Sequence, residues 1–238
     1  MRKGTAMSAV GVAQGRRTGT GGGVLWAWAG AGTGLAGMVA VQASNNITAA
    51  YDEKTAGDAA RVTEAFAQQT GPLLVLHVAL MTATVLLPVF AVGLWRRLRS
   101  TLPQDSLLPA VAALGLVLTA TATLLGSGLD TELYFALNGE KSMLAPELAL
   151  IGAHWIGTIP WLWVGTGLSG VAVAAASLRH RAVPLWLGWA SVVLGGLTLV
   201  AGISPLQYTA GFIGPVWVLV AGIGLAFSRP AVPAAPGR

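Results

Sequence analysis

The sequence predicts an all-α, polytopic integral membrane protein, a bundle of six transmembrane helices with both chain ends in the cytoplasm. Hydrophobic residues make up 54% of the 238 residues and charged residues only 10%, whereas a soluble domain carries about 25% charged residues. Six runs are nearly free of charge and reach the length of about 20 residues that a helix needs to cross the hydrocarbon. None alternates apolar and polar residues as a membrane strand does. Helices therefore remain as the structure that satisfies the backbone in lipid.

The runs follow one another along the chain with short or polar connections. The fourth is longer than one span needs, so we expect it to tilt, to kink at Pro160 or to project above the membrane. Pro88 and Pro215 also fall inside runs, where each removes a backbone hydrogen bond and can kink its helix. The six predicted spans are Val24–Ala43, Pro72–Leu94, Ser106–Leu129, Leu148–Ser177, Val183–Ile203 and Tyr208–Phe227.

The first run has a second interpretation, as a cleaved signal peptide. Arg2 and Lys3 precede it, and the small residues before Ser44 fit a cleavage site after Ala43. Cleavage there would leave five spans. The long, Gly-rich segment before the run favours a retained helix.

The chain is predicted to form one membrane domain, residues 24–228, between two flexible cytoplasmic tails, residues 1–23 and 229–238. Lys and Arg concentrate in cytoplasmic segments. With the N-terminus inside, eleven of the fourteen basic residues lie inside and eight of the nine acidic residues lie outside. This distribution predicts a multi-pass protein with both chain ends in the cytoplasm, and we expect its membrane to be a bacterial plasma membrane. The net charge of +5 is therefore an orientation signal, and the sequence lacks the basic soluble face of a nucleic-acid-binding protein.

Two long segments lie on the outer side, Ser44–Gly71 and Asp130–Glu147. In the first, Asp58 can cap a short helix, Ala59–Gln69, along which Arg61 and Glu64 can pair. This segment is either a solvated cap or a lid over a cavity between helices. The second is read as a loop that mixes carboxylates with aromatic residues.

Three ionisable residues from three predicted helices share the outer layer. His77 lies about 7 Å below the outer end of its helix at 1.5 Å per residue, His154 lies at a similar depth, and Asp130 ends the third helix. Polar groups at this depth usually face the bundle interior. Helical spacing places His77, Met81 and Thr84 on one face, and likewise Thr119 and Thr123, and His154, Thr158 and Trp161. Such faces could line an outward-opening pocket, or each histidine could simply bond a neighbouring carbonyl and fix packing.

From this layer we predict a site without metal or cofactor. Two histidines and a carboxylate could bind a metal, but no HxxH, HxH or HExxH motif supports it, and the absence of Cys excludes thiolate sites. Burial favours the neutral form of a carboxyl group, which is the form that donates a proton, and aromatic rings can stabilise a cationic intermediate. The candidate catalytic residues are Asp130, Glu132, His154 and His77, and the candidate substrate-binding residues are Trp155, Thr158, Trp161, Tyr134, Phe135 and Glu64.

The carboxylates of Asp130-Thr131-Glu132, set among aromatic residues in a small six-span protein, resemble the outer layer of small membrane-bound terpene cyclases. The resemblance implies an enzyme that protonates an epoxide or alkene of a prenylated substrate and needs no metal. The sequence lacks the Asp-rich magnesium motif of cyclases that ionise a diphosphate, which fits a metal-free mechanism. In its Ala-, Gly- and Leu-rich texture the chain is also similar to six-span membrane proteins of high-GC actinobacteria, which implies an origin and no activity. The expected partners are a lipophilic small-molecule substrate and membrane lipids. The alternative is a non-catalytic accessory, binding or permease-like membrane subunit.

Overall fold

The computed structural model describes residues 24–139 and 144–228, and within these ranges every regular element is helical. The predicted tails, residues 1–23 and 229–238, lie outside the described residues. The elements are α1 (Leu25–Asn45), α2 (Ala59–Ala67), α3 (Thr70–Arg99), α4 (Leu108–Gly126), α5 (Asp130–Asn138), α6 (Pro146–Ile156), the 3-10 turn η1 (Ile159–Trp161), α7 (Val164–His180), α8 (Leu185–Ala190), the π-helical turn η2 (Ser191–Gly195), α9 (Gly196–Ile203) and α10 (Gln207–Phe227).

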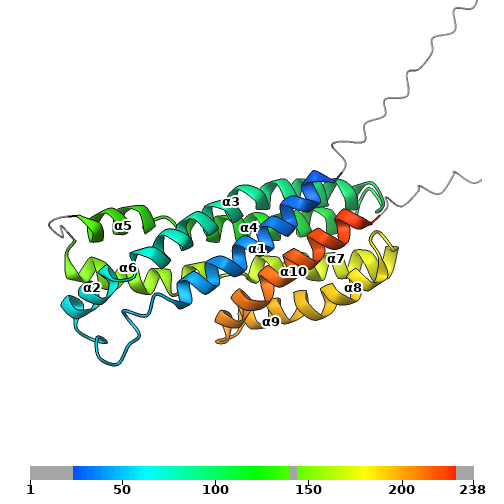
Figure 1. Ribbon diagram of the computed structural model, residues 1–238. Helices are drawn as coiled ribbons and strands as arrows, with labels where there is room; N and C mark the ends of the chain where they lie inside the picture. Colours follow the sequence, from blue (N-terminus) through cyan, green and yellow to red (C-terminus); the bar gives the residue numbers. More distant parts are fainter. Residues whose placement is uncertain (1–23, 140–143, 229–238) are drawn as a thin grey trace, which may run out of the picture.

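The long helices form a closed ring. α1 packs against α3, α3 against α4, α4 against α7, α7 against α9, α9 against α10, and α10 against α1 again. The short helices α2, α5 and α6 gather with the start of α3 beyond one end of this ring (Figure 1). The described chain begins and ends at the opposite end, beside the end of α3 and the start of α8.

Five helical segments are long and apolar enough to cross a membrane. They are Thr70–Arg99, Leu108–Asn138, Pro146–His180, Leu185–Ile203 and Gln207–Phe227. Their length and composition, in an all-helical structure, are consistent with a helical membrane protein. α1 is 21 residues long and packs between α3 and α10 but is not one of the five. Its four glycines contribute almost nothing to hydropathy, so the mean hydropathy of the helix is low for a span.

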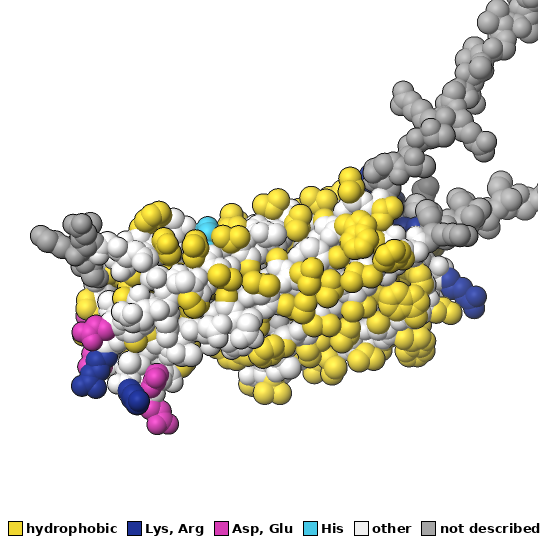
Figure 2. Space-filling view, viewed as in Figure 1, with side chains coloured by type: hydrophobic (Ala, Val, Ile, Leu, Met, Phe, Trp, Pro, Cys, Tyr) yellow, Lys and Arg dark blue, Asp and Glu magenta, His cyan; other side chains and the backbone are white. Residues whose placement is uncertain are grey.

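The surface has the composition that lipid favours. Apolar side chains cover the middle of the bundle, and the charged side chains in view lie at its two ends (Figure 2). The last turn of α3 carries Arg96, Arg97 and Arg99 at one end, and the acidic residues of the α2 region lie at the other. In water such an apolar belt would be costly, because soluble monomers rarely expose contiguous apolar patches of more than about a few hundred Å².

Small residues allow the helices to approach closely. A Cβ at Gly34 would lie 2.6 Å from Leu219 Cβ on α10, and one at Gly195 would lie 2.6 Å from Gly170 Cα on α7. The Gly-rich face of α1 thus packs against other helices of the same chain. This is how helices associate in lipid, where close packing replaces the hydrophobic effect.

Two predicted segments have helix boundaries that differ from those expected, although the fourth run does lie within one membrane-length segment, Pro146–His180. The fourth run is not one helix: α6 ends at Ile156, η1 follows, and α7 begins at Val164. Pro160 has no amide to donate and its ring crowds the carbonyl four residues earlier, and α6 ends at that residue, Ile156. The chain breaks here, whereas α3 and α10 continue through Pro88 and Pro215. The segment Asp130–Glu147 is not a loop, because α5 begins at Asp130 and α6 begins at Pro146.

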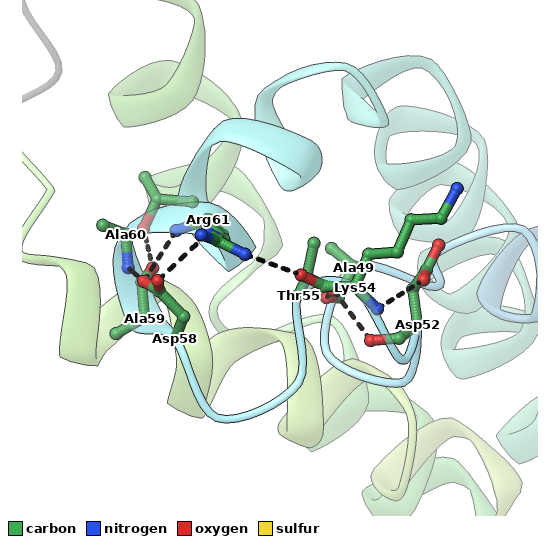
Figure 3. A network of polar contacts seen from close by, with 9 residues as sticks. Ala49, Asp52, Lys54, Thr55, Asp58, Ala59, Ala60 and Arg61 are labelled. Atoms are coloured by element: carbon green, nitrogen blue, oxygen red, sulfur yellow. Dashed lines mark hydrogen bonds and ion pairs between the residues drawn. The ribbon is translucent and has the colours of Figure 1, made fainter.

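The outer helix α2 is formed as predicted, two residues shorter at its end. The Asp58 carboxylate accepts hydrogen bonds from the amides of Ala60 and Arg61 at 3.1 and 3.2 Å. The predicted Arg61–Glu64 pair is wrong, because Arg61 Nε instead lies 3.2 Å from Asp58 Oδ2. Asp58 therefore both caps α2 and forms an ion pair with Arg61 of the same helix (Figure 3).

Candidate functional site

The structure pairs His77 of α3 with Asp130, the first residue of α5. His77 Nδ1 lies 3.9 Å from Asp130 Oδ2. The Asp130 side chain is fully buried, while 31% of the His77 side chain is exposed. Within the described part of the chain, neither carboxylate oxygen nor His77 Nδ1 has a hydrogen-bond partner. A buried polar group usually has one, so this pair has bonding capacity that the folded chain leaves unused.

The pair is the outermost in a series of polar contacts between α3 and the α4–α5 segment. One step below it, Ser127 Oγ lies 3.2 Å from Met81 Sδ. A further step down, the hydroxyls of Thr84 and Thr123 lie 2.9 Å apart. The predicted stripe of His77, Met81 and Thr84 is therefore one face of α3, and this face lies against the end of the next span.

Local structure fixes the position of Asp130. Its amide donates to the Ser127 carbonyl at 3.2 Å, in the turn that joins α4 to α5. Three residues later, Leu133 is buried and faces Gly152 of α6, where a Cβ would lie 2.7 Å from Leu133 Cδ1. Asp130 thus points inward because the same face of α5 is held against α6.

His154 belongs to a different group of side chains. Its ring stands perpendicular to that of Tyr51 with the centroids 5.3 Å apart. Next to it, Trp155 Nε1 donates to the Leu125 carbonyl at 2.9 Å and ties α6 to the end of α4. Together with Thr158 they line a shallow groove of about 400 Å³.

A larger pocket, of about 480 Å³, lies where the ends of α1, η1 and α10 meet. Its aromatic lining comes from Tyr51, Trp161, Tyr208 and Phe212. Trp161 is 6% exposed, and the rings of Tyr208 and Phe212 stand at 76° and 78° to it, with centroids 5.9 and 4.9 Å away. The remaining lining residues are Ser44, Asn45, Ile47, Thr48 and Gly157.

The Tyr51 hydroxyl stays a neutral donor over the ordinary pH range. Partial burial raises the pKa of this phenol, the nearby Tyr208 raises it further, and a hydrogen bond with Thr158 lowers it by less. Because both main effects disfavour the phenolate, Tyr51 offers the pocket a hydroxyl and an aromatic ring without a charge.

The single outer layer predicted from the sequence is divided in the structure. His77 pairs with Asp130, whereas His154 contacts Tyr51. The predicted stripe of His154, Thr158 and Trp161 is wrong, because α6 ends at Ile156 and the helical period stops there. Among the described residues, no three His, Asp or Glu side chains come close enough to hold a metal ion, so the two-histidine, one-carboxylate arrangement is not formed.

The other predicted site residues lie apart from both groups. Glu132 and Glu64 are exposed on α5 and α2. Phe135 is 70% exposed, and its ring contacts that of Tyr134 at 5.5 Å. None of these four residues lines the aromatic pocket or the groove beside His154.

Sequence reasoning missed three of the four aromatic residues in the larger pocket. Tyr208 and Phe212 are four residues apart and so share a face at the start of the last span. That spacing could have indicated an aromatic wall. Nothing in the sequence could have placed Tyr51, which comes from an irregular segment. The chain matches no protein-family model, no curated protein and no solved structure.

Proposed function

We propose that the protein crosses a bacterial plasma membrane six times, with α1 as the first span and both chain ends in the cytoplasm. The five apolar segments and the position of α1 between α3 and α10 support six spans. The arginines at the end of α3 and Arg179 at the end of α7 support the orientation, because basic residues are retained on the cytoplasmic side. The α2, α5 and α6 end of the molecule then faces outward.

We infer further that this outer end carries an enzyme site for a lipophilic, prenylated or terpenoid substrate. The observation that carries this proposal is the buried Asp130 carboxyl beside the part-exposed His77 imidazole. His77 Nδ1 and Asp130 Oδ2 lie 3.9 Å apart, and residues 24–139 and 144–228 offer no hydrogen bond to His77 Nδ1 or to either Asp130 oxygen. A buried carboxylate that faces Nδ1 orients an imidazole and stabilises its charged form. Contacts of this kind are often long before substrate binds.

In the proposed reaction the pair holds one proton and needs no metal. Because Asp130 is fully buried, His77 is the group that reaches the substrate. His77 gives its proton to an epoxide oxygen or a double bond, a ring closes or a double bond shifts, and a neighbouring carbon loses a proton that restores the pair. The result is a cyclisation or an isomerisation in which the atoms balance.

A non-catalytic role as a binding subunit is the second candidate, and the aromatic pocket favours it. That pocket is lined by rings and hydroxyls and contains none of the acids proposed for catalysis. It could hold a lipophilic ligand without changing it.

Activity assays separate the two candidates. The full chain, purified in detergent, is incubated with farnesylated and geranylated epoxides. We expect Asp130→Asn and His77→Gln to lose turnover about 100-fold or more, the usual contribution of general acid–base catalysis. His180→Gln is the matched control, because His180 is exposed in the last turn of α7, and this variant should keep its turnover. Equal turnover in all variants would exclude the proposed acid, and no turnover of any substrate by the unchanged chain would favour the binding role.

A further inference from the structure

We propose that the aromatic pocket of Tyr51, Trp161, Tyr208 and Phe212 is a binding site for the quaternary ammonium group of a small organic cation. The proposal is independent of the His77–Asp130 site, which shares no residue with this pocket. It rests on the ring arrangement, on the charge of the surroundings and on the way in which the walls are held.

The first argument is the arrangement of rings. Tyr208 and Phe212 stand nearly perpendicular to Trp161, and Tyr51 comes from another segment. The faces of aromatic rings carry negative potential, and a cation within about 6 Å of several ring centroids is attracted to all of them. A quaternary ammonium group suits such walls because its methyl groups need no hydrogen bonds.

The second argument is charge. None of the nine residues that line the pocket is charged. The lining therefore has no basic group to repel a cation, and it has no carboxylate, which would favour a cation that donates hydrogen bonds over a quaternary ammonium group. Among the described residues of the outer segments 44–71 and 130–147, two basic side chains, Lys54 and Arg61, are exposed, against six exposed acidic ones: Asp52, Glu53, Asp58, Glu64, Glu132 and Glu147. An excess of one charge raises the local concentration of the opposite ion, so the surrounding surface favours a cation.

The third argument is that the walls are built before any ligand arrives. Trp161 Nε1 donates to Ser44 Oγ at 3.0 Å, which fixes the buried indole. Tyr51 fits only because residue 157 is glycine, since a Cβ there would collide with the Tyr51 hydroxyl. Rings that are already in place save the entropy cost of ordering them on binding.

The segment that carries Tyr51 is itself held by polar contacts. Thr55 Oγ1 donates to the Ala49 carbonyl at 2.6 Å, the Lys54 amide donates to Asp52 Oδ1 at 2.9 Å, and Arg61 Nη1 donates to the Lys54 carbonyl at 3.5 Å (Figure 3). These bonds connect the turn after Tyr51 to the capped start of α2. Tyr51 is therefore positioned by the outer segment, which gives that segment a role beyond covering the bundle.

The test compares choline with 3,3-dimethylbutan-1-ol, which has the same shape but a carbon in place of the charged nitrogen. The full chain is titrated with each by calorimetry in a neutral maltoside detergent. We expect choline to bind at least about fivefold more tightly, since several ring faces contribute to the attraction. Equal affinity for the two probes, or no binding of choline, would overturn the proposal.

Variants locate the site. Tyr208→Leu and Phe212→Leu should each weaken choline binding at least about fivefold by removing one ring. Phe227→Leu is the matched control, because Phe227 is an exposed aromatic residue at the other end of the same helix, and it should bind choline as the unchanged chain does. Unfolding temperatures verify that each variant is folded. Choline binding that survives both pocket substitutions in folded protein would contradict the assignment.

Two further measurements identify the source of the cation and separate this site from the proposed reaction. Added phosphatidylcholine competes with choline if the natural ligand is a lipid headgroup and leaves choline binding unchanged if it is a free cation; either result retains the ammonium site. Asp130→Asn and His77→Gln should bind choline normally. Loss of choline binding in these two variants would show that the pocket is not an independent site.

Discussion

The indole of Trp161 donates a hydrogen bond to Ser44, 117 residues earlier in the chain, at 3.0 Å. Ser44 Oγ in turn donates to the Ile156 carbonyl at 2.9 Å. One hydroxyl therefore joins the end of α1, the end of α6 and η1. This hydroxyl links the broken fourth span to the first one.

Removal of this hydroxyl should destabilise the bundle. Ser44→Ala leaves a buried indole N–H and loses one bond to the Ile156 carbonyl, and an unsatisfied buried group costs about 1–3 kcal/mol. We expect a lower unfolding temperature, measured by fluorescence in detergent. Ser100→Ala, at an exposed position, is the control, and an equal change in both variants would contradict the role given to Ser44.

Close packing of α1 on α10 gives a second prediction. Gly34→Ala would place a Cβ 2.7 Å from Leu219 Cα, and overpacking of this kind costs about 1–3 kcal/mol. Gly196→Ala is the matched control, because nothing lies within 4 Å of a Cβ there and alanine is the better helix former. We expect the first substitution to lower the unfolding temperature and the second to leave it equal or higher. A similar loss in both would show that α1 and α10 do not pack as described.

Topology is directly measurable because the chain has no cysteine. Thr131→Cys and Ser100→Cys each introduce one thiol at an exposed position. A membrane-impermeant maleimide added to whole cells should label Thr131→Cys, and it should label Ser100→Cys only after the membrane is opened. The reverse pattern would place the His77–Asp130 pair on the cytoplasmic side and refute the proposed orientation.

Tyr51 should ionise at higher pH than an ordinary tyrosine. Its pKa is raised in the folded protein, mainly by burial, so the unfolded chain releases this proton first as the pH rises. The contribution of Tyr51 to stability is thus complete below the pKa of a free tyrosine, which is about 10, and is lost as the pH rises through the higher folded value.

The measurement for this prediction is the absorbance of tyrosinate near 295 nm. Titration of the unchanged chain and of Tyr51→Phe gives a difference curve that belongs to Tyr51. A midpoint above that of free tyrosine agrees with a partly buried hydroxyl, whereas a midpoint at or below it would show that Tyr51 is not packed against Gly157 and Thr158.

The sequence was most informative where one physical rule decides the structure. Runs of apolar residues located the helices, and the Asp58 cap located α2. The spacing of His77, Met81 and Thr84 identified a real helix face, because α3 is continuous from Thr70 to Arg99. These features depend on residues that are near one another in the chain.

It was least informative where the chain leaves regular structure or where distant segments meet. The helical period carried past Gly157 placed Thr158 and Trp161 on a face that does not exist, since α6 ends at Ile156 and a 3-10 turn follows it. The pairing of Tyr51 with Tyr208 and Trp161 depends on how α1, η1 and α10 pack together. No local pattern contains that information.

The contact of α1 with α10 makes the bundle a ring that closes between its earliest and latest helices. During synthesis, the groove around Gly34 therefore has only lipid to face until residues 207–227 emerge. Because α1 cannot pack against α10 before α10 is made, assembly of this protein finishes late. A chain truncated before α10 would leave the Gly34 face of α1 uncovered and accessible to the quality-control proteases of the membrane.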